Sequence, residues 1–221
     1  MTHASNRSIR LESWIPVAHP TPRKLRHSAD YYAQAMVKYS GIAEYHSYAE
    51  YLNGGLMEGD PTIESWVPQP FRFRLGRAFY IPDVYVKYKD GRRVIHELKP
   101  RAEFDPDRRE QLQQFCAFHD VVFDVIANEW VLARELLAEN WLLITRTLVS
   151  ATAIDTDHLE RDIIDRFISV KEGCLGDFVD PGNPEGSFLN AIALFRLCHR
   201  GHLLMQLDKA PLDYNTVVTL P

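Results

Sequence analysis

The chain has only three cysteines in 221 residues, which argues against two kinds of covalent or metal stabilisation. Cys116, Cys174 and Cys198 are odd in number and widely separated, and none belongs to a CxxC pair. A disulfide framework needs paired cysteines, and a structural zinc site needs closely spaced ones. We therefore expect three reduced thiols.

The sequence also has no long hydrophobic run. No stretch approaches the roughly 20 apolar residues that cross a bilayer, and no apolar segment follows a basic start as in a secretory signal. With 46% hydrophobic and 25% charged residues, the composition is that of an ordinary globular protein. We expect a cytoplasmic protein without a membrane partner, long enough for one large domain or two small ones.

Basic residues are scarce in the second half of the chain. Residues 1–110 carry 17 Lys and Arg against 14 Asp and Glu, a net charge of +3, whereas residues 111–221 carry 8 against 16, a net charge of −8. Because contact with phosphates needs clustered cations, a nucleic-acid surface is expected in the first half. The acidic second half is more typical of a surface that meets other proteins.

The first 150 residues alternate between helical and strand-like patterns. Residues 1–30 are Pro-rich and basic, and we expect an extended arm there rather than a packed element. Helical character follows over 45–57, strand-like runs occupy 71–75 and 78–88, a helical period returns over 107–120, and 121–127 reads as a buried strand. A helix over 131–148, interrupted near Asn140, completes an α/β (α+β) domain over residues 31–150.

Small residues at 151–153 mark the expected start of a second domain, residues 151–221. Asp155 and Thr156 can cap a helix over 155–173, and residues 187–201 form the next helix. Strand-like runs follow over 202–207 and 214–220. Helices followed by a terminal β-hairpin indicate a small winged helix-turn-helix, a module that docks proteins as well as DNA.

Asp83, Glu97 and Lys99 interrupt a predicted hairpin at positions where a plain sheet would carry Val or Ile. If Asp90 and Gly91 formed a two-residue loop, Asp83 would face Leu98 and the two acids would lie on opposite sides of the sheet. If the loop is Lys89-Asp90-Gly91, with Gly91 left-handed in a bulge, Asp83 lies opposite Glu97 and Lys99 shares their face.

The second register favours a metal-dependent hydrolysis site. Opposed Cβ atoms sit roughly 5 Å apart, and two neighbouring carboxylates repel unless a cation compensates them. Mg²⁺ takes oxygen ligands from one or two carboxylates and accepts phosphate oxygens, and a lysine beside it can orient or deprotonate a water and stabilise charge on phosphorus. The competing interpretation has Asp83 as a turn residue after Pro82, and Glu97 and Lys99 on an exposed hairpin face.

The "PD…ELK" pattern resembles the PD-(D/E)xK restriction-endonuclease-like superfamily, and its surroundings resemble the TnsA transposon-end endonucleases. The similarity spans about residues 45–130 and depends on "SYAEY", "LMEGDPTIESWVPQPFRF", "YIPDVYV" and "HELKP". It implies a restriction-endonuclease-like core with a mixed sheet flanked by helices. By resemblance, Glu50, Asp83, Glu97 and Lys99 would be catalytic, and Glu50, Asp83 and Glu97 would bind two Mg²⁺ or Mn²⁺ ions.

Members of that family cut the 5′, non-transferred strand at transposon ends during cut-and-paste transposition. The resemblance implies three partners: transposon-end DNA, a TnsB-like DDE transposase that cuts the other strand, and a TnsC-like AAA+ ATPase regulator. It also implies a cytoplasmic protein that is associated with the nucleoid. The alternatives are a restriction or repair nuclease that acts alone, and a non-catalytic winged-helix adaptor.

Several residues are candidates for DNA contact. Arg72 and Arg74 alternate with apolar residues on one strand, where the competing interpretation is a solvated face. Gln69 could fix the loop beside the site or meet the DNA backbone. The arm residues Arg23, Lys24 and Arg26 could follow the backbone or enter a minor groove. His96 should point away from Glu97 because strand side chains alternate, so we expect it to be packed or hydrogen-bonded.

Overall fold

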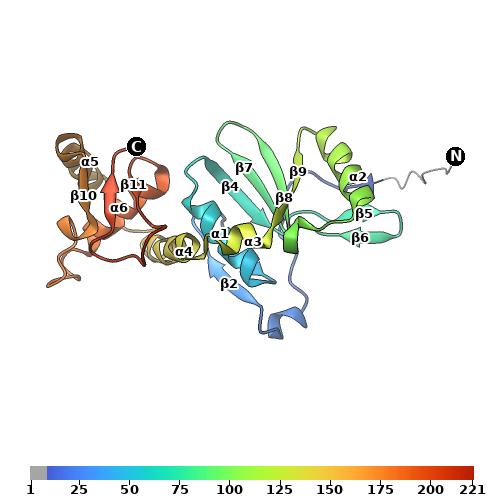
Figure 1. The fold of residues 1–221 in the computed structure, drawn as a ribbon, viewed down its shortest axis with the longest axis horizontal. Helices are drawn as coiled ribbons and strands as arrows, with labels where there is room; N and C mark the ends of the chain where they lie inside the picture. The colour runs from blue at the N-terminus through green and yellow to red at the C-terminus, as the bar shows by residue number, and fades with distance from the viewer. Residues whose placement is uncertain (1–8) are drawn as a thin grey trace. The chain divides into compact units, whose positions relative to one another are not determined.

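The computed structural model describes residues 9–221, which form a mixed α/β chain as predicted (Figure 1). The chain divides into two compact units. The N-terminal unit comprises the residues up to Ala33, Ile42–Tyr51 and Thr62–Ala133. The C-terminal unit comprises Gln34–Gly41, Leu52–Pro61 and Arg134–Pro221. Among the described residues, no helix has the length and apolar character needed to span a bilayer.

A mixed four-stranded sheet is the centre of the N-terminal unit. Its order is β4 (Ile63–Pro68), β7 (Val84–Tyr88), β8 (Arg93–Lys99) and β9 (Val122–Ala127). The first three strands are antiparallel neighbours, and β9 runs parallel to β8. Parallel neighbours need a crossover, and α2 (Pro106–Ala117) lies in that connection. Asp105 caps α2, because its carboxylate accepts a hydrogen bond from the backbone N–H of Arg108.

The β7–β8 hairpin adopts the three-residue loop. Tyr88 donates its backbone N–H to the carbonyl of Arg92, and Gly91 has a φ of 90° that favours glycine. The ladder continues through Val86 opposite Val94 to Val84 opposite His96. The predicted three-residue loop and its register are therefore confirmed, and the same register extended by one residue puts Asp83, which precedes β7, in line with Glu97.

The N-terminal segment is packed, which corrects the expected free arm. β1 (Ile9–Arg10) pairs with β5 (Phe73–Leu75), which pairs with β6 (Ala78–Tyr80) to form a three-stranded sheet. Trp14 lies against Phe71 and stacks on Phe115. The prediction was wrong because Ile9, Leu11 and Trp14 pack against the hydrophobic core, although the residues around them are basic and Pro-rich. The first eight residues of the expected arm lie outside the described part of the chain.

Further elements precede Ala133 in the chain, and their residues within 34–41 and 52–61 belong to the C-terminal unit. They are η1 (Leu25–His27), β2 (Tyr32–Ala35), β3 (Ile42–Tyr45), η2 (Pro100–Ala102) and α3 (Asn128–Leu132). β2 and β3 pair as a separate two-stranded sheet. α1 (Tyr48–Gly59) begins after Ser47, three residues later than the expected helical segment, because Tyr45 belongs to β3.

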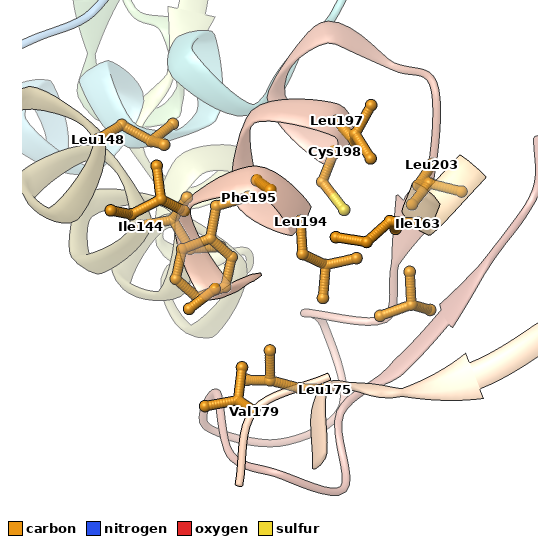
Figure 2. Packing of buried hydrophobic residues seen from close by; sticks show 14 of the residues in the cluster. Ile144, Leu148, Ile163, Leu175, Val179, Leu194, Phe195, Leu197, Cys198 and Leu203 are labelled. Atoms are coloured by element: carbon orange, nitrogen blue, oxygen red, sulfur yellow. The ribbon is translucent and has the colours of Figure 1, made fainter. Parts of the chain in front are cut away.

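Helices and a three-stranded sheet build the C-terminal unit. The elements are α4 (Glu135–Ser150), α5 (Asp157–Val170), β10 (Glu172–Cys174), η3 (Leu175–Asp177), α6 (Phe188–Arg200), β11 (Leu204–Met205) and β12 (Val217–Thr219). The sheet has the order β10-β12-β11 and is antiparallel. Its hydrophobic core gathers Ile144 from α4, Ile163 from α5 and Leu194 from α6 (Figure 2).

The unit boundary lies earlier than the expected position at residue 150. Ile144 and Leu148 of α4 pack in the core of the C-terminal unit. The break expected near Asn140 lies instead between α3 and α4, and α4 runs through Asn140. The Asn140 side chain is buried, donates to the carbonyls of Leu207 and Ala210, and accepts from the N–H of Leu212. A residue that favours turns therefore serves here to fasten a loop to the helix.

Candidate active site

Glu97 is the centre of the candidate site, because both of its carboxylate oxygens have partners. Its side chain is 4% exposed. Oε1 lies 2.6 Å from Nζ of Lys99, and Oε2 accepts a 2.6 Å hydrogen bond from the hydroxyl of Tyr80. Lys99 follows Glu97 by two residues on β8, so both side chains leave the same face. Burying a carboxylate is costly unless its oxygens are paired and hydrogen-bonded, and both Glu97 oxygens are.

Asp83 is joined to the same site by its backbone and its side chain. Its carboxylate accepts a 2.7 Å hydrogen bond from the N–H of Leu98, and its carbonyl accepts from the N–H of Gln69. Gln69 follows β4 and Asp83 precedes β7 by one residue each, so their backbone bond continues the β4–β7 pairing just beyond the two strands. Gln69 is 7% exposed, which disfavours direct contact of its side chain with a DNA backbone, and its role in fixing the loop stays a prediction.

The environment of Asp83 disfavours its charged form. Burial, followed by the negative charges of Glu97 and Glu50, raises the pKa of Asp83 well above its usual range. The hydrogen bond from Leu98 and the charge of Lys99 oppose this shift but do not cancel it. A carboxylate held near two other acids is a position where a cation would be strongly favoured.

Lys99 remains a cation in this setting. Burial lowers the pKa of Lys99, but the hydrogen bond and charge of Glu97, with the charges of Asp83 and Glu50, outweigh burial and raise it above the usual value. The side chain is 37% exposed, so the ammonium can reach a substrate at the surface. The geometry therefore fits a lysine that orients a water or stabilises negative charge, and fits deprotonation of a water less well.

Glu50 has a structural role that accounts for its position. Ser47 accepts a hydrogen bond at Oγ from the N–H of Glu50 and donates one from its hydroxyl to Glu50 Oε1. Oε2 of Glu50 accepts from the N–H of His46. This is a capping-box arrangement at the start of α1. The charge of Glu50 still acts on Asp83 and Lys99, so the structure brings it into the electrostatic neighbourhood of the site.

The donor set suits a magnesium ion with few protein ligands. Within residues 9–221, no three His, Cys, Asp or Glu side chains form a group that could by itself hold a metal. Mg²⁺ is commonly bound by one or two carboxylates, with water and substrate phosphate completing its coordination. The two carboxylates of Asp83 and Glu97 fit that pattern, because each carboxylate oxygen has a second lone pair beyond its present partner. Glu50 also has such lone pairs, but both of its oxygens bond to the start of α1.

The expected DNA-contact arginines lie in two places. Arg72 and Arg74 are exposed on the outer face of the β1-β5-β6 sheet, where the guanidinium of Arg72 lies 3.7 Å from the centre of the Phe79 ring. Arg23 and Lys24 are also exposed, just before η1. Arg26 differs, because it forms a 3.1 Å ion pair with Glu44 that compensates its charge.

His96 is packed on the other side of β8, as alternation predicts. It pairs with Val84 on one side and Asp124 on the other. Burial lowers the pKa of His96 to about 4, an effect that Asp124 opposes and Arg92 reinforces. Its Nδ1 is a buried atom without a hydrogen-bond partner among the residues described. His96 is therefore neutral at physiological pH.

Tyr80 is a site residue that the sequence pattern did not identify. It is buried, stacks on Phe73, and has Arg108 over its ring at 4.4 Å. Burial and the Glu97 carboxylate raise its pKa, so the hydroxyl keeps its proton and acts as a donor. The only sequence signal is its position three residues before Asp83, which is a weak one. Such outer hydrogen bonds orient a metal-binding carboxylate.

Comparison with known proteins adds no assignment. No family model matches the chain, and no curated protein matches it significantly. The resemblance to transposon-end endonucleases therefore stays a prediction, and the function has to be argued from the geometry of Asp83, Glu97 and Lys99.

Proposed function

We propose that the N-terminal unit is a Mg²⁺-dependent DNA endonuclease with a PD-(D/E)xK core. One observation carries this proposal: the β7–β8 register puts Asp83 in line with Glu97, Asp83 accepts a hydrogen bond from Leu98 N–H, and Lys99 contacts Glu97 at 2.6 Å. A surface hairpin does not need to bury a carboxylate and surround it with a second acid, a lysine and a tyrosine. Perturbed titratable groups gathered in this way are typical of catalytic sites.

The residues divide the chemistry between them. Asp83 and Glu97 would hold the metal, with Tyr80 fixing the direction of the Glu97 carboxylate. The bound Mg²⁺ would polarise the scissile phosphate and activate water. Lys99, as a cation, stabilises the charge that grows on the phosphate oxygens and orients the attacking water. Glu50 contributes charge to the site and caps the start of α1.

The transposition role is the further part of the proposal. The residues that carry the TnsA resemblance include Gln69, Asp83, Glu97 and Lys99. The backbone bond of Gln69 to Asp83, the bond of Asp83 to the N–H of Leu98, and the Lys99–Glu97 pair support this part of the proposal. In the C-terminal unit, α5, β10, α6 and the β11–β12 hairpin follow one another in the order of a winged helix. We assign that unit to docking within a complex that also holds a DDE transposase and an AAA+ regulator.

Strand-resolved cleavage of a labelled transposon end tests the proposal. The native end, the adjacent transposase and Mg²⁺ are incubated with wild-type protein, Asp83→Ala or, as a matched control, Asp90→Ala in the exposed hairpin loop. We expect Asp83→Ala to lose the 5′-strand nick while the 3′ cut and complex assembly persist, and Asp90→Ala to cleave normally. Unchanged 5′ cleavage by Asp83→Ala would favour the non-catalytic adaptor. Cleavage without the transposase would favour the stand-alone nuclease.

A further inference from the structure

The outer face of the β1-β5-β6 sheet concentrates arginines from separate parts of the chain. Arg10 of β1 pairs directly with Arg74 of β5, and Arg74 pairs with Phe79 of β6. Arg72 reaches across to the Phe79 ring at 3.7 Å. All four side chains are exposed, and Phe79 is 54% exposed. The inner face of the same sheet carries Phe73 and Tyr80 against the core.

The pairing of Arg10 with Arg74 is unfavourable on its own. Like charges directly opposite each other in an antiparallel pair destabilise the sheet, and β1 has only two residues with which to offset this. Among residues 9–221, Arg10, Arg72 and Arg74 make no salt bridge. Some other cations of the unit do pair with acids, as Arg26 does with Glu44 and Lys87 with Glu64.

A polyanion outside the chain would compensate this charge. Arg72 and Arg74 are two residues apart on one extended segment, about 7 Å in separation, so both can contact one sugar-phosphate backbone. Phe79 holds the Arg72 guanidinium in place by a cation–π contact, which reduces the conformational freedom lost on binding. Fixed guanidinium groups suit phosphate because they donate two parallel hydrogen bonds.

We propose that the outer face, defined by Arg10, Arg72, Arg74 and Phe79, binds the phosphate backbone of duplex DNA. The proposal rests on the proposed nuclease function and extends it. Phe79 and Tyr80 are consecutive on β6, so one points outward while the other points to Glu97. The sheet thus separates the outer face from the carboxylates. This face holds DNA that flanks the cleaved bond, and the scissile phosphate lies elsewhere.

Salt-dependent binding of a fluorescein-labelled, random-sequence duplex tests this surface. Anisotropy titrations in the full-length protein compare wild type, Arg10→Glu and the double variant Arg72→Ala/Arg74→Ala. Arg146→Glu, an exposed arginine on α4, is the control with the same charge change. We expect the double variant to lower the slope of log K against log salt by about two, because each phosphate contact contributes about 0.9. The control should keep the wild-type slope.

Arg10→Glu gives the most specific outcome. Replacing one arginine of the pair creates an opposite-charge pair with Arg74, so the urea midpoint of unfolding should rise while DNA affinity falls. A general loss of folding would lower both. Unchanged salt dependence in the double variant, or equal losses in the Arg146→Glu control, would overturn the proposed surface. Binding of an acidic protein partner, with no effect on DNA, would also overturn it.

The nuclease proposal is tested separately with the same protein variants, now given the native transposon end, the adjacent transposase and Mg²⁺. At saturating DNA, the outer-face variants should cut the 5′ strand at the wild-type single-turnover rate, because they touch neither Asp83 nor Glu97. Asp83→Ala should bind the random-sequence duplex with the wild-type salt slope and fail to cut the 5′ strand of the transposon end. Loss of binding in the outer-face variants together with full cleavage by Asp83→Ala would support the surface and reject the assigned site.

Discussion

The ion pair between Lys99 and Glu97 makes the sharpest prediction. Lys99→Met removes the charge while keeping the length of the side chain, and leaves Glu97 with Tyr80 as its remaining partner. Breaking a fully buried pair costs about 3–5 kcal/mol, whereas exposed pairs contribute about 0–1 kcal/mol. Glu97 is 4% and Lys99 37% exposed, so this pair lies between the limits. We expect Lys99→Met to lower the free energy of unfolding by about 1–3 kcal/mol.

A double-mutant cycle isolates this term. Wild type, Lys99→Met, Glu97→Gln and the double variant are unfolded in urea at neutral pH. The double variant should recover part of the stability lost in each single variant, because neither charge is then left unpaired. Lys87→Met is the matched control: its 2.8 Å pair with Glu64 joins two side chains that are 43% and 47% exposed. The control should change stability by less than about 1 kcal/mol.

Cleavage separates structure from catalysis in the same four proteins. If Lys99 and Glu97 serve the chemistry, the double variant should be folded and inactive, because regained stability cannot replace the ammonium or the metal ligand. Cleavage retained by Lys99→Met would remove that residue from the catalytic set. A coupling energy indistinguishable from zero would refute the view that the pair is desolvated.

Three further predictions concern stability and reactivity. The pKa of His96 is about 4 in the folded protein against an ordinary 6.5, so as pH falls the unfolded chain takes up this proton first. The free energy of unfolding of wild type, measured in urea, should therefore fall by up to about 3 kcal/mol relative to that of His96→Asn between pH 6.5 and 4. A difference between the two proteins that does not change with pH would contradict this. At Gly55 an added Cβ would lie 2.5 Å from a carbonyl oxygen of α4. Gly55→Ala should therefore lower the free energy of unfolding in urea by about 1–3 kcal/mol, although alanine normally stabilises a helix relative to glycine. In the folded protein, maleimide should label the half-buried Cys174 before Cys116 and Cys198, because burial raises the pKa of those two thiols to about 12. Mass spectrometry measures the labelling rates, and equal rates at the three thiols would contradict this.

Local patterns predicted the part of the site that depends on one hairpin. Gly91 in a three-residue loop determines the register, and the register brings Asp83 opposite Glu97. The Ser47-x-x-Glu50 spacing is also a local signal, because it is the pattern of a capping box, and it explains why Glu50 stands where it does.

Features that depend on distant packing were not predictable in this way. Tyr80 reaches Glu97 only because β6 folds back beside the central sheet, and Arg10 meets Arg74 only because β1 pairs with a strand more than sixty residues later. The early part of the chain was expected to be an arm because its composition is basic and Pro-rich, whereas Trp14 seals a hydrophobic core. Helical periodicity in α4 likewise does not say which of two cores its apolar face will join.

The burial of α6 bears on what the C-terminal unit binds. In a helix-turn-helix protein, the helix that enters the major groove exposes polar side chains along one face. From Ala191 to His199, every residue of α6 except Arg196 is buried. Arg196 donates to Thr156 and to the carbonyl of Ala151, and Arg200 forms a 2.7 Å pair with Glu160. The positive charges of α6 are therefore engaged within the unit.

This arrangement favours a protein partner over DNA for the proposed winged helix. Residues 134–221 carry 13 Asp and Glu against 8 Lys and Arg, so their net charge opposes contact with phosphates. The uncompensated arginines lie in the other unit, on the outer face of the β1-β5-β6 sheet. Under the proposed function, DNA contact and cleavage would belong to the N-terminal unit, and the acidic C-terminal unit would suit a partner that presents a basic surface.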